Sequence, residues 1–390
     1  MGTTAKDSFV DSEQLLHDAA IERAGSDDFG DASYLEGLQV LLKAYDTEAR
    51  LNEFGTGAVR EGLIKALVQR LRVQQQLKET PAVLGTEIKR PIIILGLVRT
   101  GSTALHYLMG QDPDMQCLEY WLAEHPQPRP PRNHWDEYKD FQYSLAELDM
   151  MYKADPALKA IHFMMADGPE ECRHLLFQHF TDDAFEVNAS IPSYSEWYQQ
   201  KNLKKTYEQH KAAIQLIGSN EADKRWLLKY PVHLRHLDAL LEVYPDACIV
   251  QTHRDPARVL PSYCSLMAGF RAIYEDNCDP KDMAERQMEL WAAGAEKAMA
   301  VREAHDPAQF YDLHFHDFMD DPIGSVKKIY GHFDQELSEA GEARLQDWQE
   351  NHPQHKHGKH GYSDEIGYTR ESIWKRFGDY MDAHGMEREV

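Results

Sequence analysis

The chain has 390 residues, a formal charge of −23 and a hydrophobic fraction of 42%. A chain of this size can bury a large core in one or two domains, and its negative charge argues against a nucleic-acid partner. No segment reaches the apolar length of a membrane span, and residues 1–8 lack the apolar stretch of a secretory signal. The five cysteines are odd in number and form no C-x-x-C pair, which favours reduced thiols in a cytoplasmic protein.

Residues 1–88 are predicted to form an N-terminal helical extension. Three segments, 11–23, about 34–51 and 58–77, carry apolar residues at helical spacing. They contain no group of residues that suggests catalysis. We therefore expect them to pack on the core, or on a second subunit if the protein is a homo-oligomer.

Residues 89–110 predict a strand, a glycine-bounded loop and a helix. Ile92–Leu95 suit a strand buried on both faces, Gly96 ends it, and Gly101–Thr103 begin a helix. This layout directs backbone N–H groups at a phosphate. The spacing is close to the triphosphate loop G-x-x-x-x-G-K-[ST], but Ser102 replaces the lysine and the nearest cation is Arg99. A loop without that lysine is poorly suited to a triphosphate, which disfavours a P-loop kinase.

Residues 111–218 are expected to be an insertion on the substrate side. Residues 111–135 are predicted to be a long loop with a proline-rich run, which has the character of a substrate lid. Residues 136–218 read as mostly helical and are rich in aromatic side chains. These side chains suggest an apolar acceptor, although core packing explains them equally well.

Strands are predicted again at 225–229, 247–252 and 309–313, and the first two are each followed by a helix. Strands that alternate with helices indicate an α/β fold whose ligand lies at the carboxyl ends of a parallel sheet. Arg99, Lys229 and Arg254 should then share one rim of the sheet. Helices are expected over most of 280–350 and near 370–384. Residues 351–360 form a basic, histidine-rich loop without a known zinc spacing, so no metal site is predicted.

Three motifs, in this order, resemble those of sulfotransferases that use 3′-phosphoadenosine 5′-phosphosulfate (PAPS). Val98–Thr103 resembles the 5′-phosphosulfate loop, with Val98 in place of a proline. Lys229–His233 resembles the bacterial K-[ST]-P-x-H-L signature, and Arg254 with Ser262 matches the pair that holds the 3′-phosphate. A guanidinium and a hydroxyl near a helix N-terminus suit a dianion.

The resemblance begins near residue 30 and implies the fold and the reaction. The expected fold is a P-loop-like parallel sheet flanked by helices, with large helical additions, over residues 89–390. The expected reaction is transfer of a sulfuryl group from PAPS to a hydroxyl, less often an amine, of a small molecule, without a metal. The residues implied in donor binding are Arg99, Thr100, Gly101, Ser102, Thr103, Ala104, Arg254, Ser262, Lys356, His357 and Gly358.

The catalytic roles are less determined by the sequence. Arg99 and Lys229 would stabilise charge on the phosphosulfate, and either Glu119 or His233 would take the acceptor's proton. Several bacterial sulfotransferases use a glutamate shortly after the loop, and a carboxylate near an anionic donor would have a raised pKa. His233 is instead suggested by the second motif. Two other functions remain open: a small-molecule kinase of the P-loop type, and a nucleotide-binding relative that lost the base.

Overall fold

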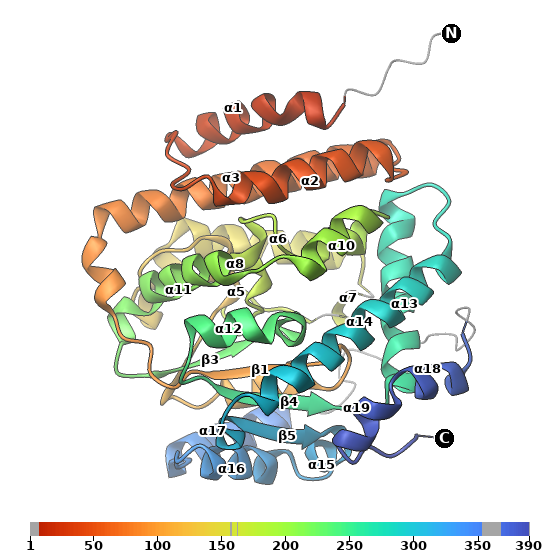
Figure 1. Cartoon of the computed structure of the whole chain (residues 1–390). Helices are drawn as coiled ribbons and strands as arrows, with labels where there is room; N and C mark the ends of the chain where they lie inside the picture. Colours follow the sequence, from red (N-terminus) through yellow and green to blue (C-terminus); the bar gives the residue numbers. More distant parts are fainter. Residues whose placement is uncertain (1–7, 157, 162, 353–367, 390) are drawn as a thin grey trace.

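The computed structural model describes residues 8–156, 158–161, 163–352 and 368–389. Figure 1 shows a parallel sheet with helices on both of its faces and a helical layer stacked above them. The α/β fold predicted from the sequence is therefore confirmed. Among the described residues, no helix is both long and apolar enough to cross a membrane.

The sheet has five strands in the order β2-β3-β1-β4-β5, and neighbouring strands pair in parallel. The strands are β1 (Ile92–Gly96), β2 (Met115–Cys117), β3 (Arg225–Lys229), β4 (Cys248–His253) and β5 (Phe310–His314). The central strand β1 is buried throughout. Its Ile92 and Ile94 join the apolar cluster on one face, whereas Ile93 and Leu95 join the cluster on the other. A strand covered on both faces requires this unbroken apolar run.

The N-terminal extension forms three helices, close to the predicted segments. They are α1 (Glu13–Ala24), α2 (Ser33–Thr47) and α3 (Glu53–Glu79). Their buried leucines belong to the same apolar cluster as the helical insertion and one face of the sheet. Asn52 caps α3 by accepting a hydrogen bond from the N–H of Gly55 (2.7 Å). A Cβ at Gly55 would lie 2.1 Å from the carbonyl oxygen of Tyr274, so α3 directly abuts the end of α13. The extension thus packs on its own chain; the boundary at residue 88 stays a prediction.

The segment 111–135 is not the continuous loop that the sequence suggested. It contains β2 and a short helix, α5 (Tyr120–Glu124). Strand β2 has three residues and pairs with β3 from Arg225 to Leu227, so it depends on its neighbour rather than on a pattern of its own. The other helices of the insertion are α6 (Lys139–Ala154), α7 (Leu158–Ile161), α8 (Arg173–Phe177), α9 (Ala184–Asn188), α10 (Pro192–Gln200) and α11 (Lys204–Gly218).

Helices follow the strands and carry the chain back to the amino end of the sheet, where the next parallel strand begins. They are α4 (Ser102–Met109) after β1, α12 (Leu237–Val243) after β3, and α13 (Pro256–Tyr274) and α14 (Pro280–Glu303) after β4. After β5 come α15 (Phe315–Asp320), α16 (Pro322–His332), α17 (Glu339–Asn351), α18 (Arg370–Arg376) and α19 (Gly378–Ala383). Short 3₁₀ turns are η1 (Val10–Ser12), η2 (Pro81–Gly85), η3 (Arg132–Glu137), η4 (Ser219–Glu221), η5 (Pro231–His236) and η6 (Pro307–Gln309).

Candidate active site

Three adjacent strands, β3, β1 and β4, end side by side, and a candidate donor residue or loop follows each of them. Lys229 is the last residue of β3, the loop 97–101 follows β1, and Arg254 follows β4. The register places Ile94 opposite Lys229 and Gly96 opposite Thr252. The sheet order therefore places the three predicted cationic positions along one rim, as expected for ligands at the carboxyl ends of parallel strands.

The loop after β1 is held in a conformation that requires glycine. Gly96 has φ of 146°, and a Cβ there would lie 2.4 Å from the carbonyl oxygen of Thr252. Gly101 (87°) and Arg99 (62°) also have positive φ. The Thr100 hydroxyl donates to the carbonyl of Leu97 (2.8 Å) and lies 2.6 Å from the hydroxyl of Thr252. The loop is thus fixed to β4 and leads directly into α4, whose first N–H groups lack helical partners.

Lys229 lies against this loop from the other side. Its side chain is 1% exposed, and its Nζ donates to Oγ1 of Thr103 (3.1 Å) and to Oε1 of Glu171 (2.5 Å). Glu171 was not predicted from the sequence. It lies between the insertion's Pro169 and α8, where no local pattern distinguishes it from its neighbour Glu170. Its proximity to Lys229 is a product of the tertiary structure.

The segment after Lys229 is anchored by a buried acidic pair. The Tyr230 hydroxyl lies 3.0 Å from Oδ2 of Asp182 and 2.6 Å from Oδ1 of Asp183. Arg235 pairs with Asp183 at 3.5 Å. Burial, followed by the charge of Asp183, raises the pKa of Asp182 to about 8. At neutral pH this favours a protonated Asp182; burial also raises the pKa of Asp183.

An aromatic ring lies between Arg254 and the same loop. Its guanidinium carbon is 4.0 Å from the centroid of the Phe315 ring. A Cβ at Gly101 would lie 3.1 Å from that ring, so Phe315 separates the loop from Arg254. Ser262 is buried on α13, the helix that begins two residues after Arg254 and is capped by the Asp255 carboxylate. Arg254 does not pair with Asp255 but with Glu389, close to the C-terminus.

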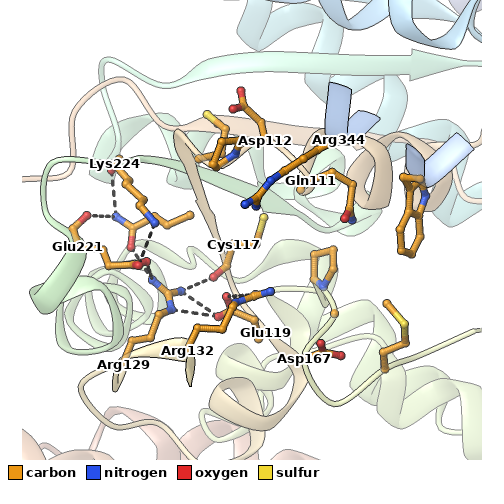
Figure 2. Close-up of a pocket in the computed structure, with 18 of the residues that line it drawn as sticks. Gln111, Asp112, Cys117, Glu119, Arg129, Arg132, Asp167, Glu221, Lys224 and Arg344 are labelled. Atoms are coloured by element: carbon orange, nitrogen blue, oxygen red, sulfur yellow. Dashed lines mark hydrogen bonds and ion pairs between the residues drawn. The ribbon is translucent and has the colours of Figure 1, made fainter. Parts of the chain in front are cut away.

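Glu119 lies in a different environment, at the β2 edge of the sheet (Figure 2). It is 5% exposed; its Oε2 pairs with Arg129 (2.9 Å), and its Oε1 lies 3.5 Å from Arg132. Arg129 also bonds to Gln116 (2.8 Å) and Glu221 (2.9 Å). These residues line a cavity of about 460 Å³ that is also lined by Gly110, Trp348 and His352. The two arginines bind Glu119 at this edge of the sheet, whereas Lys229 contacts Thr103 at the start of α4.

His233 lies inside the core in the 3₁₀ turn η5. Its Nδ1 is 2.7 Å from the Tyr207 hydroxyl, and its ring packs against His210. Burial, and then the nearby His210, hold the pKa of His233 well below its usual value. The other predicted donor residues Lys356, His357 and Gly358 lie outside the described residues.

One group among the described residues has the composition of a metal site: His253, Asp312 and His384, whose ligand atoms lie within 4.8 Å of one another. Asp312 already accepts two hydrogen bonds of 2.7 Å from Arg302 and lies 2.7 Å from Nε2 of His253. Because the guanidinium neutralises the carboxylate, this group is better suited to holding α19 against β4 and β5 than to binding a cation.

The comparisons with known proteins agree with this fold. Residues 91–339 match the model of the sulfotransferase family. The chain is 39% identical to STF1 from Mycobacterium tuberculosis H37Rv, with a TM-score of 0.88 over 95% of this chain and 100% of that one. It is 28% identical to STF9 from Mycobacterium avium, with a TM-score of 0.90 over 100% of both chains.

A curated relative is similar over a shorter stretch. It is omega-hydroxy-beta-dihydromenaquinone-9 sulfotransferase Stf3 from Mycobacterium bovis, which is 28% identical over 173 residues, 43% of this chain and 42% of that protein. The match to this relative thus spans less than half of its length. The family model, by contrast, covers all five strands and more than half of the chain. The chain therefore belongs to the sulfotransferase family.

Proposed function

We propose that this protein transfers a sulfuryl group from PAPS to a hydroxyl, less often an amine, of a small-molecule acceptor. One observation carries the proposal: three adjacent strands end with, or are followed by, Lys229, the loop 97–101 and Arg254. Lys229 donates to Thr103 just after the loop, and Thr252 on β4 contacts Thr100 within it. A nucleotide with a 5′-phosphosulfate and a 3′-phosphate presents two separate anions. The rim supplies cations on both sides of the loop, as such a ligand needs.

The donor would be held by two groups of residues. Arg99, the backbone and hydroxyls of Thr100–Ala104, and Lys229 bind the 5′-phosphosulfate. Arg254 and Ser262 bind the 3′-phosphate, with Lys356, His357 and Gly358 proposed to complete this end. Negative charge develops on the phosphate oxygen that leaves sulfur. Fixed donors at this oxygen stabilise the transition state more than the ground state and so increase the rate.

Three residues are candidates for the general base, and the contacts favour one of them. Glu171 is 2.5 Å from Nζ of Lys229, beside the loop, so its carboxylate is close to the place of reaction. Glu119 is engaged by Arg129 and Arg132, and the burial of His233 makes its imidazole a weak base. We therefore place Glu171 ahead of Glu119 and His233. A donor phosphosulfate would compete with Glu171 for Lys229 and leave the carboxylate available to the acceptor's proton.

The acceptor is proposed to be a hydroxylated, apolar small molecule. The support is twofold: the curated relative is named for a hydroxylated menaquinone, and the insertion carries stacked aromatic side chains such as Phe177 and Phe185, whose ring centroids are 4.1 Å apart. No metal is required in this scheme, since the sulfuryl group carries less concentrated charge than a triphosphate.

Thermal-shift measurements with adenosine 3′,5′-bisphosphate, ATP with magnesium, and buffer test the donor. We expect stabilisation by the bisphosphate and little by ATP, because Ser102 replaces the lysine that a triphosphate needs. Transfer of labelled sulfate from PAPS to a panel of alcohols, phenols and amines tests the reaction. Preference for ATP with magnesium would refute the donor assignment and favour the kinase. Bisphosphate binding without transfer to any acceptor would indicate a relative without catalytic activity.

A further inference from the structure

The last described residue of the chain, Glu389, contacts Arg254, the arginine proposed to bind the donor's 3′-phosphate. After α19 the chain runs through Gly385 to Glu389, whose side chain is 15% exposed. Oε1 of Glu389 lies 3.2 Å from Nε of Arg254, and Oε2 lies 3.4 Å from Nη2. The guanidinium thus engages both oxygens of one carboxylate, which is the same two-point geometry that arginine uses for phosphate.

Two further basic side chains, from different elements, surround the same carboxylate. Nε of Arg258 on α13 is 3.6 Å from Oε2, and Nε2 of His316 on α15 is 3.2 Å from Oε1. The backbone N–H of Glu389 also donates to Oδ2 of Asp255 (2.7 Å). We call Arg254, Arg258 and His316 the Arg254 cradle. Three basic groups converging on one acidic side chain form an anion site, and an anion already occupies it.

The cradle lies next to the phosphosulfate loop. The Phe315 ring contacts the Arg254 guanidinium on one side and approaches Gly101 on the other. We propose that the Arg254 cradle is the 3′-phosphate site and that Glu389 is an intramolecular competitor, which occupies the cradle in the free enzyme and leaves it when PAPS binds. The inference rests on the proposed function, and it adds Arg258 and His316 to the residues that contact the donor.

The tail can leave without disrupting α19. Gly385, with φ of 58°, lies between the helix and Glu389 and tolerates a change of direction. The helix itself is held by Tyr380, whose hydroxyl lies 2.9 Å from Nδ1 of His253, and by His384, which lies 3.6 Å from Asp312. These anchors precede Gly385. Release of the tail therefore costs the contacts of Glu389 with the cradle and with Asp255. It also costs the packing of Arg388 on Trp374 and of Met386 on the core, but not the docking of the helix.

The competition reduces donor affinity by the fraction of time that the cradle is free. If Glu389 occupies it about nine-tenths of the time, the apparent dissociation constant of a ligand that needs the cradle rises about tenfold. A ligand that lacks the 3′-phosphate does not need the cradle, and its affinity stays the same. Competition by Glu389 therefore predicts a change in affinity for the ligand that has a 3′-phosphate and no change for the ligand that lacks it.

Calorimetric titration of the full chain tests this inference with two ligands, adenosine 3′,5′-bisphosphate and adenosine 5′-phosphosulfate. The variants are Glu389→Gln, deletion of residues 386–390, and Glu387→Gln as the matched control, since Glu387 is an exposed acidic residue of the same tail. We expect the first two variants to bind the bisphosphate about five- to tenfold more tightly than the unmodified protein. Glu387→Gln should bind like the unmodified protein, and adenosine 5′-phosphosulfate should bind all four alike.

Each other outcome overturns the inference in a recognisable way. Unchanged or weaker binding of the bisphosphate by Glu389→Gln and by the deletion would show that Glu389 does not compete with it, while the proposed donor would stand. Equal tightening for both ligands would show that the tail does not act at the 3′-phosphate. If none of the proteins binds the bisphosphate, the proposed function itself fails, and the inference fails with it.

Discussion

Replacement of Glu171 by glutamine tests which residue removes the acceptor's proton. The variant keeps an oxygen that can accept from Nζ of Lys229, now 2.5 Å from Oε1, but it can no longer take up a proton. Loss of a general base slows the chemical step by about 10²- to 10⁴-fold, equivalent to about 3 to 5 kcal/mol of transition-state stabilisation. We therefore expect kcat to fall by this factor. The KM for PAPS should not rise, because the variant removes the negative charge that competes with the donor for Lys229.

The contacts of Lys229 also predict a small loss of stability in Glu171→Gln. Lys229 is 1% exposed, so removing its carboxylate partner altogether would leave a buried charge. In Glu171→Gln the amide oxygen and the Thr103 hydroxyl still accept from Nζ. We expect a loss of about 1 to 2 kcal/mol in the free energy of unfolding, which a thermal melt can measure.

The assay is transfer of labelled sulfate in a single turnover, with Glu119→Gln and His233→Gln measured in parallel. Glu119→Gln keeps the hydrogen bonds to Arg129, and Arg129 retains its pair with Glu221 (2.9 Å), so it should fold. If Glu171→Gln retains activity within about fivefold of the unmodified protein while Glu119→Gln loses about 10²-fold or more, Glu119 is the base and the argument from proximity to Lys229 is refuted.

Three further predictions follow from the rim and its support. Gly96→Ala should cost about 2 to 4 kcal/mol in unfolding free energy, because φ is 146° and a Cβ would lie 2.4 Å from the Thr252 carbonyl oxygen; chemical denaturation measures it. Arg254→Ala should weaken binding of adenosine 3′,5′-bisphosphate by about 10- to 100-fold without changing that of adenosine 5′-phosphosulfate, by calorimetry. Asp182→Asn should flatten the pH dependence of stability. Burial and Asp183 raise the pKa of Asp182 from 3.8 to about 8, so folding takes up a proton between these pH values. The stability of the unmodified protein should therefore fall as the pH rises through that window, and the stability of the variant should fall less. Thermal melts at pH 5 to 8.5 measure the difference.

Most of the sheet was predictable because its strands are apolar and end in recognisable breaks. The predicted strands at 92–95, 225–229, 247–252 and 309–313 agree with β1, β3, β4 and β5 within one residue at each end. From the parallel arrangement alone, the loop, Lys229 and Arg254 are predicted to share one rim. The periodicity of the N-terminal leucines was equally sufficient to predict α2 and α3.

What the sequence did not reveal depends on contacts between distant segments. Strand β2 is too short to carry a pattern, and it exists because β3 offers a free edge. Glu119 appeared suitable as a base because it follows the loop closely, yet Arg129, from the proline-rich run, binds its carboxylate. Glu171 and Glu389 approach Lys229 and Arg254 from remote parts of the chain. Their neighbours in the sequence give no sign of either contact.

Lys229 supplies the positive charge that a lysine within the loop supplies in triphosphate-binding proteins. In a triphosphate loop the lysine precedes the hydroxyl residue in the loop itself, whereas this chain has Ser102 before Thr103. The positive charge comes instead from the end of β3, where Lys229 donates to the Thr103 hydroxyl. A lysine placed there reaches the start of α4 from the side rather than from within the loop. Charge from this direction suits an oxygen that bridges two groups, as between sulfur and phosphorus, because it leaves the phosphate itself to the N–H groups at the start of α4.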